Sequence, residues 1–125
     1  MKQNKILIID DEEDLSFFVK ANLELAGNYE VDVVTNGKDG LKAAVTYKPN
    51  LILLDIMMPK MDGFEVLKEL KSSAETASIP IIMLTAKGDD ESKIKAMKLY
   101  IEDYMIKPVQ IDALDSKIKQ VLKRV

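Results

Sequence analysis

Residues 5–14 read Lys-Ile-Leu-Ile-Ile-Asp-Asp-Glu-Glu-Asp, a short apolar run that ends in five consecutive acids. A run of large aliphatic residues without polar alternation is typical of a strand that is buried on both faces, as in parallel sheets covered by helices. Acids that end such a strand lie at the carboxyl edge of the sheet, where ligands of open α/β sheets bind. This stretch therefore predicts a parallel sheet and the edge of it that carries a ligand.

The same kind of apolar run recurs along the chain, separated by segments with helical periodicity. Five runs predict strands: Lys5–Asp10, Glu30–Thr35, Leu51–Asp55, Ile81–Thr85 and Asp103–Ile106. The second run is interrupted by Asp32, which favours an edge strand. Five strands, each followed by a helix, predict an α/β fold with a five-stranded parallel sheet between two layers of helices.

Apolar residues at helical spacing predict a helix after each strand. The first helix ends before Gly27, because glycine readily adopts the left-handed conformation that closes many helices. The last helix has the clearest periodicity, from Ile111 to Val125. The other three are predicted over about Gly37–Tyr47, Phe64–Lys71 and Asp90–Tyr100. We expect residues 1–125 to form a single domain.

The composition excludes several classes of function. The 125 residues include 18 bases and 21 acids, for a net charge of −3, so binding nucleic acid directly is not the expected role. The sequence has no cysteine and no histidine, which removes thiolate zinc sites, cysteine nucleophiles and the usual general base. Any metal must therefore be a hard cation with oxygen ligands. The apolar runs are too short for a membrane span or a signal peptide, which favours a cytoplasmic protein.

Polar side chains follow four of the five predicted strands. Asp10 and Asp11 follow the first strand, Asp55 ends the third, Thr85 ends the fourth and Lys107 follows the fifth. If the strand order is the flavodoxin-like 2-1-3-4-5, these side chains meet in one crevice. Clustered carboxylates repel one another unless a cation joins them, and Mg²⁺ is the obvious candidate.

This set of side chains is suited to phosphoryl transfer. A carboxylate can act as the nucleophile and form an aspartyl phosphate. A magnesium ion neutralises charge on the transferring oxygens, a lysine adds a mobile positive charge, and a threonine hydroxyl can donate a hydrogen bond to the new phosphoryl group.

The last two acids of the opening run have a simpler explanation. Glu13 and Asp14 fall in the first turn of the predicted helix, where acids interact favourably with free N–H groups and with the helix dipole. The metal interpretation therefore applies to Asp10 and Asp11, which close the apolar strand.

Four motifs resemble the receiver domain of two-component response regulators, in order and over essentially the whole chain. They are Ile6–Glu12, Leu53–Gly63, Ile82–Ala86 and Asp103–Pro108. One motif alone would be a weak signal, but all four at these separations are specific. The resemblance implies a signalling module and not a metabolic enzyme, since its only reactions would be its own magnesium-dependent phosphorylation and dephosphorylation.

The resemblance assigns the metal and the acceptor. It implies that Asp55 is the phosphoacceptor. It also implies that Asp10, Asp11 and Asp55 hold Mg²⁺ together with the backbone carbonyl of Met57, with Asp10 acting partly through water.

The resemblance also implies roles for residues on the last two strands. Thr85 and Lys107 match the positions that contact the phosphoryl oxygens. Tyr104 resembles the family's switch aromatic, which turns inward when Thr85 moves toward the phosphoryl group. The peptide bond between Lys107 and Pro108 is expected to be cis.

The implied partners are proteins. A sensor histidine kinase or phosphotransfer protein would donate the phosphoryl group, and the surface around the fourth helix and fifth strand would then change to control a downstream effector protein or domain. Membrane insertion is not expected, whereas a phosphorylation-dependent dimer is compatible with the family.

The chain departs from the family pattern at the end of the fourth helix. Family members often carry Gly-Ala where this chain has Tyr100-Ile101. Because tyrosine tolerates positive φ poorly, we expect this helix to end differently, with Tyr100 packed down. Val109 also replaces a phenylalanine that often follows Lys-Pro.

Two other classes of function stay open. A phosphohydrolase of the haloacid-dehalogenase type shares the fold style, but residues 10–14 lack its Asp-x-Asp-x-Thr/Val pattern. An interaction module of the same fold would never use the pocket. Turnover of a small phosphomonoester would favour the phosphohydrolase, whereas the intact acceptor and metal residues argue against the interaction module.

Overall fold

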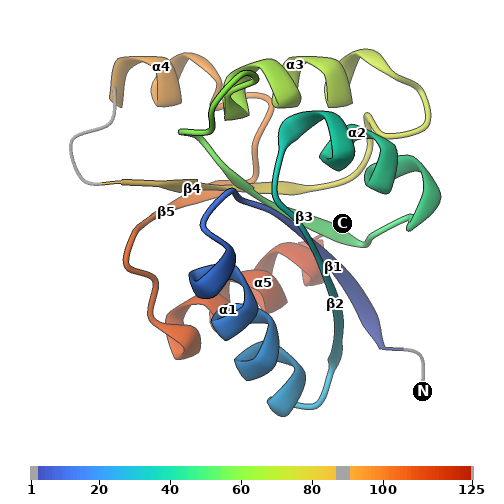
Figure 1. The fold of residues 1–125 in the computed structure, drawn as a ribbon. Coiled ribbons are helices and arrows are strands. Elements are labelled where there is room, and N and C mark those ends of the chain that lie inside the picture. The colour runs from blue at the N-terminus through green and yellow to red at the C-terminus, as the bar shows by residue number, and fades with distance from the viewer. Residues whose placement is uncertain (1–2, 87–90, 125) are drawn as a thin grey trace.

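The computed structural model describes residues 3–86 and 91–124, in which strands and helices alternate (Figure 1). The strands are β1 (Asn4–Ile9), β2 (Tyr29–Val34), β3 (Leu51–Asp55), β4 (Ile81–Thr85) and β5 (Asp103–Ile106). The helices are α1 (Glu13–Leu25), α2 (Gly37–Thr46), α3 (Gly63–Ser72), α4 (Glu91–Ala96) and α5 (Ile111–Arg124). All the predicted elements are present, and only α4 differs from its prediction by more than about two residues.

The sheet is parallel throughout, with the predicted order β2-β1-β3-β4-β5. β2, which contains Asp32, is an edge strand as predicted. The strand order reverses between β1 and β3, and this reversal marks the ligand-binding edge of such sheets. The register keeps the strand ends level, because Ile9 pairs with Leu54 and Thr85 pairs with Ile106. The residues that follow these strands therefore emerge at one edge.

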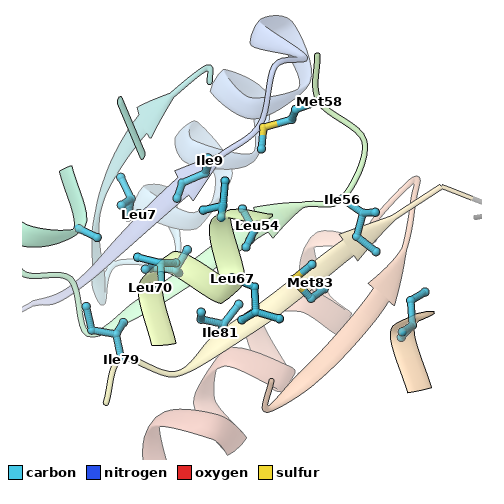
Figure 2. Packing of buried hydrophobic residues seen from close by; sticks show 14 residues of the cluster. Leu7, Ile9, Leu54, Ile56, Met58, Leu67, Leu70, Ile79, Ile81 and Met83 are labelled. Atoms are coloured by element: carbon cyan, nitrogen blue, oxygen red, sulfur yellow. The ribbon is translucent and has the colours of Figure 1, made fainter. Parts of the chain in front are cut away.

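Helices cover both faces of the sheet, with α1 and α5 on one face and α2, α3 and α4 on the other (Figure 1). Figure 2 shows the core on the second face, where Leu67 and Leu70 of α3 lie in one cluster with Leu54 and Ile81 of the sheet. The three central strands are dense in aliphatic residues because both of their faces are covered. Within the described ranges, none of the helices has the length and hydropathy of a bilayer-crossing segment.

The end of α4 differs from the prediction. The helix stops at Ala96, and turns continue to Tyr100, whose N–H donates to the Met97 carbonyl at 2.8 Å. The predicted start at Asp90 lies outside the described residues. The expectation that Tyr100 packs down was wrong: Tyr100 is 52% exposed, and Ile101 packs against the core instead.

This ending needs no glycine. Among the described non-glycine residues, positive φ values occur at Lys48 and Lys60, so the turns after α4 use ordinary negative φ angles. The hydrogen-bonded turns direct the aliphatic Ile101, which immediately precedes β5, toward the core in place of the tyrosine. β5, which follows these turns, is only half buried, and its Tyr104 is 45% exposed.

The two-sided burial of β3 makes a testable prediction about stability. Leu54 is fully buried in β3, so Leu54→Ala is expected to lower the free energy of unfolding by about 3 kcal/mol through lost burial and a residual cavity. Urea denaturation measures this change. Leu25→Ala at the end of α1, where the side chain is 83% exposed, is the matched control and should change the stability by less than about 0.5 kcal/mol. Equal losses in the two variants would contradict the placement of Leu54 in the core.

Candidate functional site

Three carboxylates lie together at the carboxyl edge of the sheet. Asp10 and Asp11 follow β1, and Asp55 ends β3. Each offers one oxygen, and these oxygens all lie within 4.8 Å of one another. Asp10 and Asp55 are each only 3% exposed, whereas Asp11 faces solvent. The pairing of β1 with β3 brings together acids that are far apart in the sequence, and the predicted cluster of carboxylates is thus present.

Backbone hydrogen bonds fix Asp10. Its N–H donates to the Val34 carbonyl of β2 at 3.0 Å, which extends the ladder between β1 and β2 by one residue. Its Oδ1 accepts a hydrogen bond from the Glu12 N–H at 3.0 Å. Such an aspartate turn sets both the direction of the side chain and the entry into α1.

The chain that follows Asp55 is equally constrained. The Ile56 N–H donates to the Leu84 carbonyl of β4 at 3.0 Å, and the Ile56 carbonyl accepts from the Gly63 N–H at 2.7 Å. The side chain of Asp62 caps the start of α3. The loop from β3 to α3 is therefore closed at its base, directly beside the Asp55 carboxylate.

Lys107 adds a positive charge from the other side of the site. Its Nζ lies 2.9 Å from Asp10 Oδ2, 3.2 Å from Asp55 Oδ1 and 2.7 Å from Glu12 Oε1. Its backbone N–H donates to the Thr85 carbonyl at 2.7 Å, which ties the residue to the end of β4. The peptide bond from Lys107 to Pro108 is cis, as expected. One ammonium thus contacts three carboxylates.

Burial and neighbouring charges shift the pKa values of Asp55 and Lys107. Burial raises the pKa of Asp55 from 3.8 to about 7, and the neighbouring charge of Asp10 adds to the rise, while the ion pair with Lys107 opposes it. Burial alone would lower the pKa of Lys107, but its hydrogen bonds to Glu12 and Asp10 outweigh burial and raise that pKa. Negative charge at the site therefore exceeds what one lysine balances.

The donor set fits a hard divalent cation. The converging atoms are all carboxylate oxygens, which are the ligands that Mg²⁺ prefers, and two of the three residues are buried. A divalent cation would also favour the charged form of Asp55, which burial and Asp10 disfavour. The acidic triad of Asp10, Asp11 and Asp55 can therefore hold a metal ion.

The other predicted site residues lie on β4, on β5 and in the loop after β3. Thr85 is buried at the end of β4, and its hydroxyl donates to the Ala86 carbonyl at 3.2 Å. Met57, two residues after Asp55, has an exposed side chain. Tyr104 lies on β5, three positions before Lys107, with its side chain partly in solvent. Each of these three residues lies on a strand or loop that leads to the charged cluster and, being uncharged, takes no part in its ion pairs.

Glu12 is the pocket residue that sequence analysis missed. Its carboxylate is exposed and reaches Lys107, which is distant in the sequence. In a run of five acids, residue type does not distinguish the one that contacts a lysine from those that only face the helix dipole. The contact depends on β5 lying beside β4, so only the folded arrangement identifies it.

The raised pKa of Asp55 predicts how the metal-free stability depends on pH. The folded chain holds this proton more tightly than the unfolded chain, so the stability that Asp55 contributes is fully present below about pH 4 and is lost as the pH rises through about 7. In EDTA, we expect Asp55→Asn to gain stability over the wild type across this window, by on the order of a few kcal/mol. Excess Mg²⁺ should remove the advantage at neutral pH.

Urea denaturation of both proteins, in EDTA and in Mg²⁺ at several pH values, measures this difference. Titrating groups far from the pocket are common to both chains and cancel in the comparison, so the difference reports the titration of Asp55 together with its contacts to Asp10 and Lys107. A difference in stability that stays constant with pH in EDTA would contradict the prediction.

Comparison with known proteins identifies the family to which this fold and pocket belong. The model of the response regulator receiver domain matches residues 6–119. The chain therefore belongs to the response regulator receiver domain family, and it is a signalling module of two-component systems with an acidic pocket formed by Asp10, Asp11 and Asp55.

Individual relatives agree with this assignment. The alkaline phosphatase synthesis transcriptional regulatory protein PhoP of Bacillus subtilis is 42% identical over 120 residues, which cover 96% of this chain and 49% of that protein. The DNA-binding dual master transcriptional regulator RpaA of Synechocystis is 41% identical with the same coverage. The chain thus spans about half the length of the curated relatives it matches.

Solved structures show the same fold. The receiver domain of the Francisella response regulator 1452 is 32% identical, with a TM-score of 0.85 over 98% of each chain. The Vibrio cholerae chemotaxis protein CheY4 is 27% identical, with a TM-score of 0.87 over 96% of this chain and 99% of that chain.

Proposed function

We propose that residues 1–125 act as one phosphoacceptor switch, which takes a phosphoryl group from a histidine kinase or phosphotransfer protein onto Asp55 in a magnesium-dependent reaction. The observation that carries this proposal is the setting of Asp55, a buried carboxylate beside two further carboxylates and 3.2 Å from the Lys107 ammonium. Membership of the receiver family supports the same reaction.

The residues of the pocket have distinct tasks in this reaction. A carboxylate oxygen of Asp55 attacks the phosphorus of the donor, so an O–P bond forms while the bond from phosphorus to the donor nitrogen or oxygen breaks. Lys107 offers its ammonium to the oxygens that carry negative charge during transfer. Mg²⁺, held by Asp10, Asp11, Asp55 and the Met57 carbonyl, would supply further neutralisation of those oxygens.

The proposed output begins at Thr85 and Tyr104. In this structure the Thr85 hydroxyl donates to the Ala86 carbonyl, and a phosphoryl group on Asp55 would offer it a stronger, charged acceptor. Tyr104 is partly exposed on β5 and would move inward when Thr85 changes partner. The surface of α4 and β5 would then differ between the two states and control a downstream effector protein or domain.

Intact mass measurement tests the proposed function. The chain is incubated with acetyl phosphate, with Mg²⁺ or with EDTA, and its mass is then recorded. We expect one added phosphoryl group in Mg²⁺ and none in EDTA. If no adduct forms, binding of beryllofluoride in Mg²⁺ separates rapid hydrolysis from an inactive pocket, and failure to bind it in folded protein would overturn the proposal. Steady turnover of a small phosphomonoester would instead indicate a phosphohydrolase.

A further inference from the structure

Glu12 occupies the cap position before α1, yet its side chain is used elsewhere. Its carboxylate makes no capping hydrogen bond to α1 within the described part of the chain, although acids at helix N-termini commonly do so. Its Oε1 instead accepts from Lys107 Nζ at 2.7 Å, the shortest of the three ion pairs of that lysine. The Glu12 carboxylate therefore contacts Lys107 instead of the first turn of α1.

The three partners of Lys107 are not equivalent. Asp10 and Asp55 belong to the triad that can hold a divalent cation, so a bound ion would compete with Lys107 for their oxygens. Glu12 lies outside that triad. Of the three carboxylates, Glu12 is therefore the one whose hold on Lys107 does not depend on the state of the metal site.

The Lys107 side chain needs a partner that keeps its ammonium in one position. Its ammonium sits on a flexible four-carbon stem, and several rotamers compete once strong partners are withdrawn. A charged hydrogen bond from Glu12 limits that freedom at the side of the pocket that opens to solvent.

We propose that Glu12 is a positioning residue, which anchors the Lys107 ammonium within reach of Asp55 while a divalent cation engages Asp10 and Asp55 and the phosphoryl group is transferred. This inference rests on the proposed function of Asp55. Glu12 acts through Lys107 and does not touch the transferred group.

Kinetics of phosphorylation in five variants test this role of Glu12. With acetyl phosphate and saturating Mg²⁺, Glu12→Gln is expected to slow phosphorylation about 3- to 10-fold, because the amide keeps an acceptor oxygen but loses the charge of a pair that solvent already weakens. Glu12→Asp restores the charge but shortens the reach, so it should also be slow. Glu13→Gln removes the same charge one residue further along and should stay within about 2-fold of the wild type. In a Lys107→Ala background, Glu12→Gln should have no further effect.

A structural readout accompanies the kinetics. The NMR signals of the Lys107 Cε and Nζ groups, recorded with beryllofluoride and Mg²⁺, should show increased mobility in Glu12→Gln and not in Glu13→Gln. A role of Glu12 in the stability of α1 alone would leave these signals unchanged.

The outcomes separate this inference from the proposed function. If the wild-type chain takes up no phosphoryl group and no beryllofluoride, the proposed function is wrong, and the positioning role of Glu12 is then wrong as well. If the wild type reacts and Glu12→Gln reacts at the same rate, only the anchor is overturned. Equal slowing by Glu12→Gln and Glu13→Gln, or slowing that persists in Lys107→Ala, would likewise overturn it.

Discussion

Asp55→Asn is expected to reduce phosphoryl uptake from acetyl phosphate by about 100-fold or more, because the amide lacks the anionic oxygen that attacks phosphorus. The side chain keeps nearly the same volume, so the fold should persist. Intact mass in Mg²⁺ measures the loss, and far-ultraviolet circular dichroism verifies the fold. Asp14→Asn, an acid in the first turn of α1, is the matched control and should be phosphorylated like the wild type.

The residue that carries the phosphoryl group decides whether Asp55 is the acceptor. Peptide mapping of the wild-type adduct should place the phosphoryl group on the peptide that contains Asp55. A stoichiometric adduct in Asp55→Asn would show that another carboxylate accepts the group, and the proposed role of Asp55 would then be wrong.

Gly63→Ala is expected to cause the second large effect, a loss of about 3 kcal/mol or more in the free energy of unfolding together with impaired phosphorylation. A Cβ at this position would lie 2.7 Å from the Ile56 Cα and would also clash with the Asp55 carbonyl oxygen. These are backbone atoms and cannot rotate away. The start of α3 must therefore move away from the end of β3, and the loop from β3 to α3 must move with it.

Gly27→Ala is the matched control for that experiment. Gly27 has a φ of +94° after α1, and a Cβ there meets open space, so its cost is conformational and about 1 kcal/mol. Its effect on phosphorylation should be small because Gly27 lies outside the pocket. Similar losses of stability and activity in the two variants would contradict the steric role of Gly63.

Most of the fold follows from local patterns in the sequence. Aliphatic runs such as Leu51–Leu54 predict two-sided burial, and that burial is present because helices cover both faces of the sheet. The positions of Asp10, Asp55 and Lys107 at or just after the ends of their strands, together with a strand order, were sufficient to predict that these charges meet.

What the sequence does not predict depends on contacts between distant segments. Periodicity continues through Ile94, Met97 and Ile101, so it cannot distinguish a long fourth helix from a short helix followed by turns. The packing of Ile101 in place of Tyr100 depends on how those turns meet β5. The contact between Glu12 and Lys107 likewise arises only when the sheet brings the segment after β1 close to the segment after β5.

The ion pairs of Lys107 connect the segment after β5 to the ends of β1 and β3. A chain still emerging from the ribosome carries Asp55 long before it carries Lys107, so Asp55 is then without the ammonium that pairs with it. If Asp55 acts as proposed, the site therefore becomes competent only when β5 docks beside β4, so the order of synthesis completes the pocket last.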